Sequence, residues 1–182
     1  MGTRYKGLFL AWAMACAAGW ASAAEPLTPV PSLDVPRYMG TWYEIAKLPN
    51  WFQRKCAGST RAQYSLQVDG RVQVANSCRL ATGEFDDALG VARQIGAPNS
   101  PKLKVRFAPA WLSLLPMVWG DYWVVELDDN YQWAAISEPG REYLWILSRS
   151  PRMDPAVYAE LLARLARKGL NVQKLEVTRQ DD

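Results

Sequence analysis

The chain has 182 residues, 21 of them basic and 18 acidic, and it contains no histidine. Without an imidazole it cannot build a Ser-His or Cys-His catalytic pair, a histidine-ligated zinc site or a histidine-ligated haem. The two charge types nearly cancel and are interspersed, so the sequence lacks the basic footprint of a nucleic-acid-binding protein. The length suits one domain with a sizeable core.

Residues 1–24 have the pattern of a secretory signal peptide. Two basic residues precede an apolar run, Leu8–Trp20, which ends in the small residues Ala21-Ser22-Ala23-Ala24. This run is too short for a membrane-spanning helix and suits cleavage near its end. We therefore expect an exported chain. The alternative is that Cys16 is the lipidated cysteine of a bacterial lipoprotein.

Whether the signal peptide is cleaved or Cys16 is lipidated, Cys56 and Cys78 are the two remaining unmodified cysteines. An exported chain meets an oxidising compartment, so we expect them to form one disulfide, with two free thiols as the alternative. The bond would close a loop of about 22 residues, worth about 3 kcal/mol in the chain-entropy model.

The middle of the chain has the alternation of consecutive β-strands. Apolar and polar residues alternate through Thr60–Leu66 and again after Val72, and the intervening Asp69-Gly70 is a two-residue hairpin signal. The remaining predicted strands are an opening strand at Trp42 and the segments Phe85–Ile95, Leu103–Phe107, Tyr122–Leu127, Tyr131–Ser137 and Tyr143–Ser148.

A helix follows the strands. Asp154 is the expected N-cap, Pro155 the first helical residue and Gly169 the C-terminal cap. The apolar stripe of this helix is Val157, Leu161, Leu162 and Leu165. Val172–Thr178 would add a short ninth strand.

Eight sequential antiparallel strands predict an all-β fold, an up-and-down β-barrel with one C-terminal α-helix packed outside. A barrel of this size can hold one small ligand. Residues 25–34 are expected to be an N-terminal linker, and residues 35–182 the barrel domain.

The strand sequences resemble the lipocalin family, its bacterial members in particular. Gly40-Thr41-Trp42-Tyr43 looks like the first lipocalin motif, Asp121-Tyr122 occupies the place of the second, and Arg149 that of the third. The match spans roughly residues 35 to 178. The resemblance implies that Gly40, Trp42, Asp121 and Arg149 are structural, with Arg149 lying across Trp42 as a cation on a π face at the closed base of the barrel.

If Trp42 marks the closed end, the first, third, fifth and seventh connections lie at the mouth, and Cys56 comes near Cys78 there. The fifth connection, Pro109–Trp119, is uncharged and bears two tryptophans, which is unusual for a surface loop. It could be a packed lid, a dimer interface or a membrane-touching tip. The aromatic pair Trp51-Phe52 in the first connection is compatible with all three of these roles.

Strand parity predicts the cavity lining. Leu103, Val105 and Phe107 must face inward because the basic residues between them cannot. Tyr143 and Trp145 lie an even number of residues before Arg149 and should therefore face inward with it. The family resemblance adds Tyr122. The complete predicted lining is Tyr64, Val72, Val74, Leu103, Val105, Phe107, Tyr122, Tyr143 and Trp145.

The resemblance implies a non-enzymatic carrier of the Gram-negative periplasm or outer membrane. Its ligand would be a fatty acid or lysophospholipid, with phenols and an Arg or Lys at the mouth holding the polar head. No metal or cofactor is expected. One rival is an interaction protein with a filled barrel that docks through its apolar loop. Another is an enzyme that uses Glu44 and Glu126 as an inward carboxylate pair.

Overall fold

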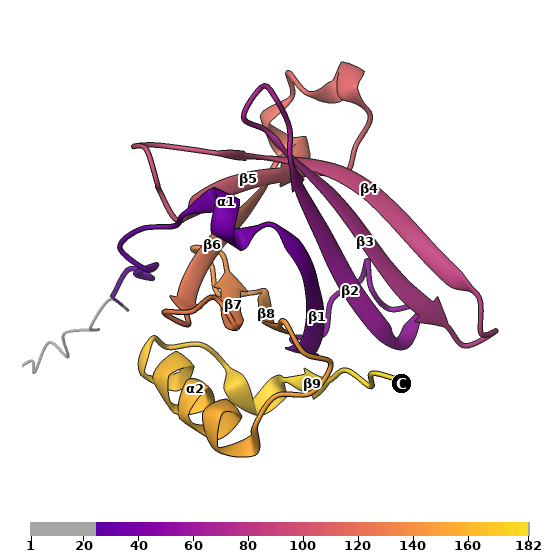
Figure 1. The fold of residues 1–182 in the computed structure, drawn as a ribbon, viewed down its shortest axis with the longest axis vertical. Coiled ribbons are helices and arrows are strands. Elements are labelled where there is room, and N and C mark those ends of the chain that lie inside the picture. Colours follow the sequence, from indigo (N-terminus) through magenta and orange to yellow (C-terminus); the bar gives the residue numbers. More distant parts are fainter. Residues whose placement is uncertain (1–24, 182) are drawn as a thin grey trace, which may run out of the picture.

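The strands close into an antiparallel barrel with a helix packed on the outer wall (Figure 1). The computed structural model describes residues 25–181, so the predicted signal peptide and Cys16 lie outside the described residues. The hydrogen-bonded strand order is β2-β3-β4-β5-β6-β7-β8-β1-β9, and a further β1–β2 pairing closes the barrel. The bounds are β1 Gly40–Lys47, β2 Cys56–Leu66, β3 Val72–Leu80, β4 Phe85–Gln94, β5 Lys102–Arg106, β6 Gly120–Leu127, β7 Trp133–Ser137, β8 Leu144–Ser148 and β9 Glu176–Val177.

The eight predicted barrel strands are confirmed, although several ends move. β2 begins at Cys56 instead of Thr60, and β7 begins at Trp133 because Tyr131 has a φ of 60° and belongs to the preceding turn. The hairpin after β2 is longer than a two-residue turn. The Gln67 amide donates to the Arg71 carbonyl, and Gly70 supplies the positive φ that the turn needs.

The predicted C-terminal helix is α2, Pro155–Arg167. The Asp154 carboxylate accepts hydrogen bonds from the amides of Ala156 and Val157, and Gly169 follows the last turn with a φ of 77°. Leu161 and Leu165 are buried against the outer wall. The predicted ninth strand is mostly a 3-10 turn, η3 Val172–Lys174, and only Glu176–Val177 pairs with β1.

The segment before the barrel is not a free linker. Leu27 and Leu33 are buried, and the Val30 amide donates to the Val124 carbonyl, so residues 25–34 pack along the barrel. A short helix that was not predicted from the sequence, α1 Val35–Tyr38, follows this segment. It places Tyr38 inside the barrel.

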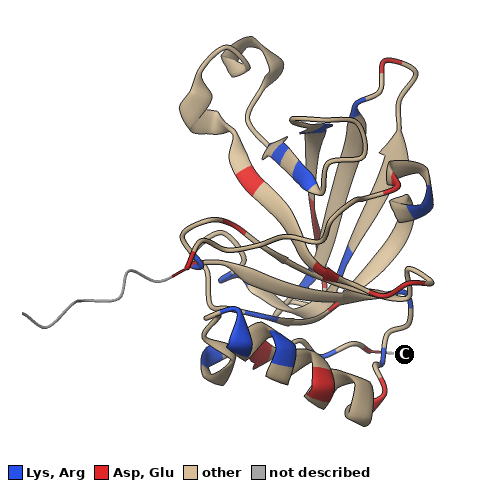
Figure 2. Cartoon of the chain, turned by 90° about the vertical axis from the view of Figure 1, so that its left-hand side faces the viewer, with Lys and Arg blue, Asp and Glu red and all other residues tan. Residues whose placement is uncertain are grey.

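Two apolar cores result from the alternation along the strands. The inner core fills the barrel around Trp42, and the outer core lies between the barrel and α2. Charged residues of both signs are spread over the strands and α2, whereas the connection between β5 and β6 has none (Figure 2). Among residues 25–181, no helix is both long and apolar enough to cross a membrane.

One end of the barrel is closed by Trp42 and Arg149. Trp42 is fully buried, and the Arg149 guanidinium carbon lies 3.8 Å from its ring centroid. Arg149 also donates to the carbonyls of Thr41 and Arg37, at 2.9 and 3.0 Å. Gly40 has a φ of 97°, and a Cβ there would lie 3.3 Å from the Arg149 Nη1 atom. These contacts anchor the arginine and hold the base shut.

Candidate ligand-binding site

The barrel interior is filled near Trp42 and keeps accessible surface above it. Tyr64, Val72, Val74 and Leu103 are buried in the inner core. In contrast, Val105, Tyr122 and Trp145 pack against that core but are only partly buried. Because these side chains point inward, their accessible surface faces the space enclosed by the strands. These seven residues of the predicted lining therefore lie on the inner face of their strands.

Phe107 also points inward, at the open side of the interior. A Cβ on Gly90 of the facing strand would lie 2.8 Å from the Phe107 ring, so this glycine makes room for the phenyl group. The Phe107 side chain is 45% exposed. Gly90 was missed from the sequence, where nothing marks a glycine that faces an aromatic ring on another strand.

Arg106 faces outward as expected but is buried, which the sequence did not predict. Its guanidinium carbon lies 5.2 Å from the centroid of the Trp119 ring, and that of Arg93 lies 4.4 Å from the same centroid. Trp119 thus covers the outer wall at the root of the connection between β5 and β6. The second-motif residue Asp121 is also on this wall, in an ion pair of 2.8 Å with Lys104.

Aromatic rings gather at the mouth. Tyr143 and Trp145 stack with their centroids 5.7 Å apart. Phe52, from the connection between β1 and β2, lies 5.7 Å from Tyr143 and 6.1 Å from Trp145. From the sequence, Phe52 is only one of an aromatic pair in the first connection. It is a mouth residue in contact with the predicted lining.

A polar chain holds Trp145 in place. The indole Nε1 donates to the Gln53 Oε1 atom at 2.9 Å, and the Gln53 Nε2 donates to Glu44 at 2.7 Å. The Thr178 hydroxyl donates to the other Glu44 oxygen at 2.6 Å. Burial is the main influence on Glu44 and raises the pKa of its carboxyl. Gln53 was missed, since one amide in a loop gives no sequence signal.

The predicted pair of inward carboxylates does not form. Glu126 points toward α2, where its oxygens lie 3.4 Å from the Lys168 Nζ atom and 3.8 Å from an Arg164 guanidinium nitrogen. A β-bulge between Val124 and Glu126 inverts the parity of the strand at this point. The carboxylate-pair enzyme is therefore not supported.

Three tyrosine hydroxyls form a chain on the floor of the interior. The Tyr122 hydroxyl lies 2.8 Å from that of Tyr38 and 3.1 Å from that of Tyr64. Burial raises the pKa of Tyr64 to about 12 and the pKa values of Tyr38 and Tyr122 well above their ordinary value. All three phenols are therefore neutral at physiological pH. Tyr38 was missed because α1 was missed.

The predicted disulfide between Cys56 and Cys78 is confirmed, with the Cα atoms 5.5 Å apart. It joins the first residue of β2 to β3 at the mouth. Within residues 25–181, no cluster of three or more His, Cys, Asp or Glu side chains could hold a metal ion.

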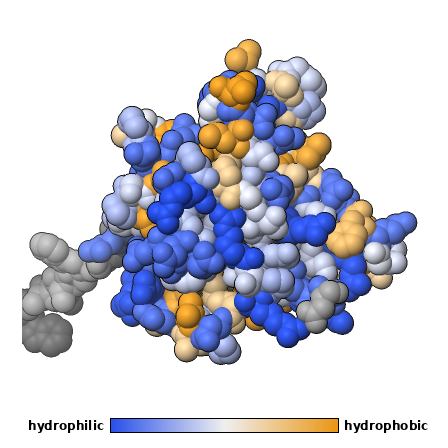
Figure 3. All heavy atoms as spheres, in the orientation of Figure 1, coloured by the Kyte–Doolittle hydropathy of each residue, from blue (hydrophilic) through white to orange (hydrophobic). Residues whose placement is uncertain are grey.

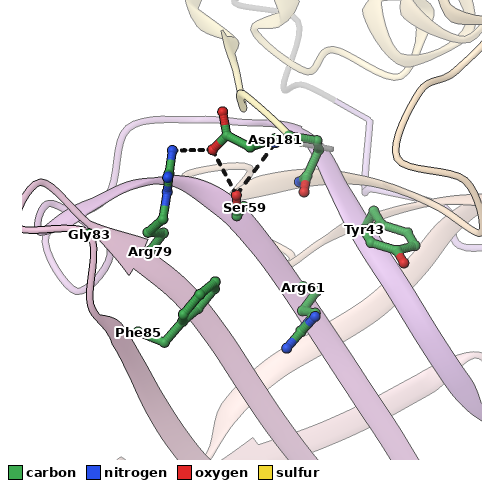
Figure 4. Close-up of a pocket in the computed structure, with 8 residues that line it drawn as sticks. Tyr43, Ser59, Arg61, Arg79, Gly83, Phe85 and Asp181 are labelled. Carbon is green, nitrogen blue, oxygen red and sulfur yellow. Dashed lines mark hydrogen bonds and ion pairs between the residues drawn. The ribbon is translucent and has the colours of Figure 1, made fainter.

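A hollow of about 300 Å³ lies on the outer wall, away from the predicted lining (Figure 4). The Asp181 side chain lines this hollow. It accepts a hydrogen bond from the Ser59 hydroxyl at 2.9 Å and forms an ion pair with Arg79. Its lining residues are Tyr43, Ser59, Arg61, Arg79, Gly83, Phe85, Gln180 and Asp181.

The connection between β5 and β6 is not a packed lid. It leaves the wall opposite Val91, part of the way along β4, and contains the 3-10 turns η1 Ala110–Leu112 and η2 Pro116–Val118. Trp111, Leu114 and Met117 are 78%, 90% and 86% exposed. Apolar spheres gather at the top of the molecule (Figure 3), where Figure 1 shows this connection. The lid prediction is therefore wrong.

A barrel plugged at one end and open at an aromatic mouth defines a class of proteins that enclose a small apolar ligand. Residues 33–180 match the model of the lipocalin-like domain, and the chain belongs to the lipocalin family. Lipocalins are typically binding carriers of small hydrophobic molecules.

Relatives include a plant lipocalin and a bacterial lipoprotein. Temperature-induced lipocalin-1 of Arabidopsis thaliana is 42% identical over 155 residues, covering 84% of this chain and 82% of the relative. Outer membrane lipoprotein Blc of Escherichia coli K12 is 39% identical over 149 residues, covering 81% and 80%. Insecticyanin of the tobacco hornworm Manduca sexta has a similar fold, with a TM-score of 0.67, 20% identity and coverage of 88% and 87%.

Proposed function

We propose that this protein is a non-enzymatic carrier that encloses a fatty acid or a lysophospholipid in its barrel. The observation that carries the proposal is the accessible surface of the inward residues Val105, Tyr122 and Trp145 beneath an aromatic mouth. Similarity to an outer membrane lipoprotein supports a place in the periplasm or outer membrane of a Gram-negative bacterium. There it would store or transport lipid and help to maintain the membrane.

The energetics are adequate for a carrier. A 16-carbon chain that buries about 14 methylenes gains roughly 11 kcal/mol, at about 0.8 kcal/mol for each methylene. Association and ordering costs reduce this gain to an affinity between micromolar and nanomolar.

Obstruction of the interior tests the proposal. Val105→Phe should weaken palmitic acid binding at least about tenfold, because the added ring occupies the space of several methylenes. Leu89→Phe is the matched control, since Leu89 lies on the outer face of β4 and is exposed. Titration calorimetry on delipidated protein gives both affinities. A wild-type protein that takes up no lipid, or two variants with equal losses, would refute the carrier.

The exposed connection between β5 and β6 favours a second role, contact with a lipid bilayer. Trp111, Leu114 and Met117 present apolar surface to solvent, and the exposed Arg93 stacks on Trp119 at the root of this connection. Apolar tips beside cations suit an anionic membrane surface. A homodimer would bury the same surface and is the alternative.

Vesicle co-sedimentation distinguishes membrane contact from homodimerisation. The triple variant Trp111→Ser, Leu114→Ser, Met117→Ser should lose binding to phosphatidylglycerol vesicles, whereas Val68→Ser with Leu89→Ser, which changes exposed residues elsewhere, should keep it. Sedimentation without vesicles reports the oligomeric state. A wild-type dimer that the triple variant converts to a monomer would overturn the membrane role.

A further inference from the structure

The floor of the barrel carries more hydrogen-bond donors than its own residues use. Tyr38, Tyr64 and Tyr122 supply three hydroxyl hydrogens, and the chain of two hydrogen bonds between them takes up two. Within residues 25–181, no further hydrogen bond of these hydroxyls is present, so one hydrogen remains available. Hydroxyl groups rotate, so Tyr38 and Tyr64 can both donate to the Tyr122 oxygen, which leaves the Tyr122 hydrogen free for a ligand.

The three tyrosines differ in how much surface they keep accessible. Tyr38 and Tyr64 are buried, whereas Tyr122, which bonds both, keeps part of its surface accessible. Tyr122 packs against the inner core, opposite Leu103 in the sheet. A ligand that enters past Tyr143 and Trp145 and fills the space beside Val105 thus meets a polar floor below apolar walls.

The electrostatic surroundings favour an uncharged oxygen at this floor. Arg149, a cation at this end of the barrel, lies behind the indole of Trp42 and donates its N–H groups to the carbonyls of Thr41, Arg37 and Tyr131. A carboxylate or phosphate on the floor would have no direct ionic partner, and burial of an unpaired charge is expensive. A carbonyl or hydroxyl oxygen needs only the one donor that the phenols offer.

We propose that the ligand enters with its polar end first and places an uncharged oxygen on the phenols of Tyr38, Tyr64 and Tyr122. The inference rests on the carrier function and narrows the ligand. It selects single-chain lipids with a small neutral end, such as a protonated fatty acid, a fatty alcohol or a simple ester. A lysophospholipid, with its charged phosphate, fits this orientation poorly.

Spin-labelled lipids test the orientation on the wild-type protein. Methyl stearate carries a nitroxide near its ester end in the 5-doxyl form and near its methyl end in the 16-doxyl form. The indole N–H signals of Trp42, on the floor, and Trp145, at the mouth, report which end is close. The 5-doxyl probe should broaden the indole signal of Trp42 more than that of Trp145. The 16-doxyl probe should broaden the signal of Trp145 more than that of Trp42. The opposite pattern would overturn the orientation yet leave the carrier intact. Failure to bind either probe would also overturn the orientation, and palmitic acid binding then shows whether the carrier function stands.

Hydroxyl deletions test the donor. Tyr122→Phe should weaken hexadecanol binding about fivefold, the usual effect of one lost hydrogen bond. Tyr158→Phe is the matched control, since Tyr158 lies on α2 outside the barrel, and it should change the affinity less than about twofold. Tyr143→Phe removes the hydroxyl at the mouth for comparison. Unfolding midpoints confirm that all three variants fold. A larger loss with Tyr143→Phe would place the polar end at the mouth and overturn the proposal. The proposal would also be overturned if lysophosphatidylcholine of the same chain length bound more tightly than hexadecanol.

Discussion

Glu44 is a buried acid whose titration depends on its surroundings. It accepts hydrogen bonds from Gln53 and Thr178, which favour the charged carboxylate, but removal from water favours the neutral acid more strongly. Sequence parity placed Glu44 on the inner face, yet only the structure shows that two loops meet at this side chain. The burial of Glu44 therefore makes the free energy of unfolding depend on pH.

The pH dependence of unfolding should reveal the raised pKa of Glu44. The folded protein holds this proton to a higher pH than the unfolded chain does. The free energy of unfolding that Glu44 contributes is therefore greatest below about pH 4, near its unfolded pKa, and falls as the pH rises through the folded pKa. Urea unfolding of wild type and Glu44→Gln between about pH 3 and pH 8 measures the difference. A difference that is flat, or that grows in favour of wild type with pH, contradicts this assignment.

At the scale of elements, the C-terminal segment completes the wall between β1 and β2. These strands pair only from Gly40 to Tyr43. Beyond that, the Thr178 amide donates to the Ile45 carbonyl, and the Ser59 amide donates to the Arg179 carbonyl. The Gln180 side chain donates to carbonyls on both strands. The segment after α2 therefore bridges a gap that would otherwise expose two strand edges.

Gly58 permits this bridge, because a Cβ there would lie 2.7 Å from the Arg179 carbonyl oxygen. Gly58→Ala should cost about 1–3 kcal/mol and loosen the C-terminus, since backbone must move to relieve the clash. Gly120→Ala is the matched control, with its nearest neighbour at 3.9 Å and an expected change within about 0.5 kcal/mol. Urea unfolding gives the stability, and carboxypeptidase digestion followed by mass spectrometry gives the release of the tail. Equal behaviour of the two variants would show that the tail is not held there.

For the whole molecule, closure depends on contacts between distant parts of the chain. Trp42 and Arg149 shut the base, α2 covers the outer core, and the disulfide joins β2 to β3 at the mouth. The two ends are therefore held by different means. Apolar burial and carbonyl hydrogen bonds secure the base, and a covalent bond secures the rim.

Loss of the disulfide should lower the free energy of unfolding by about 3 kcal/mol in the chain-entropy model, because the unfolded chain regains the freedom of the open loop. The double variant Cys56→Ala, Cys78→Ala in urea unfolding measures this change. Reduction of the wild type should lower its stability similarly, and reductant should leave the double variant unaffected. A loss below about 1 kcal/mol would show that the unfolded chain is already restricted without the bond.

Much of the barrel could be predicted from the sequence because alternation is a local property. The residues Leu103, Val105 and Phe107 show their inward face without knowledge of any partner strand. Glu126 could not be assigned in this way, since one bulge in its pairing with β7 inverts its direction. Phe52 and Gln53 were missed for a related reason. Their role depends on where a loop meets β8, which no local pattern encodes.

The sequence by itself determined the strand series and the helix after Asp154, because each is written in short local patterns. Cysteine parity favoured the single disulfide, and the lipocalin resemblance implied the pairing of Trp42 with Arg149. Only the tertiary structure decided that the apolar connection after β5 is exposed, that Glu126 turns outward, and that three phenols meet on the floor. Tyr38, Tyr64 and Tyr122 are far apart in the chain, and closure of the barrel together with the packing of α1 brings their hydroxyls within hydrogen-bonding distance.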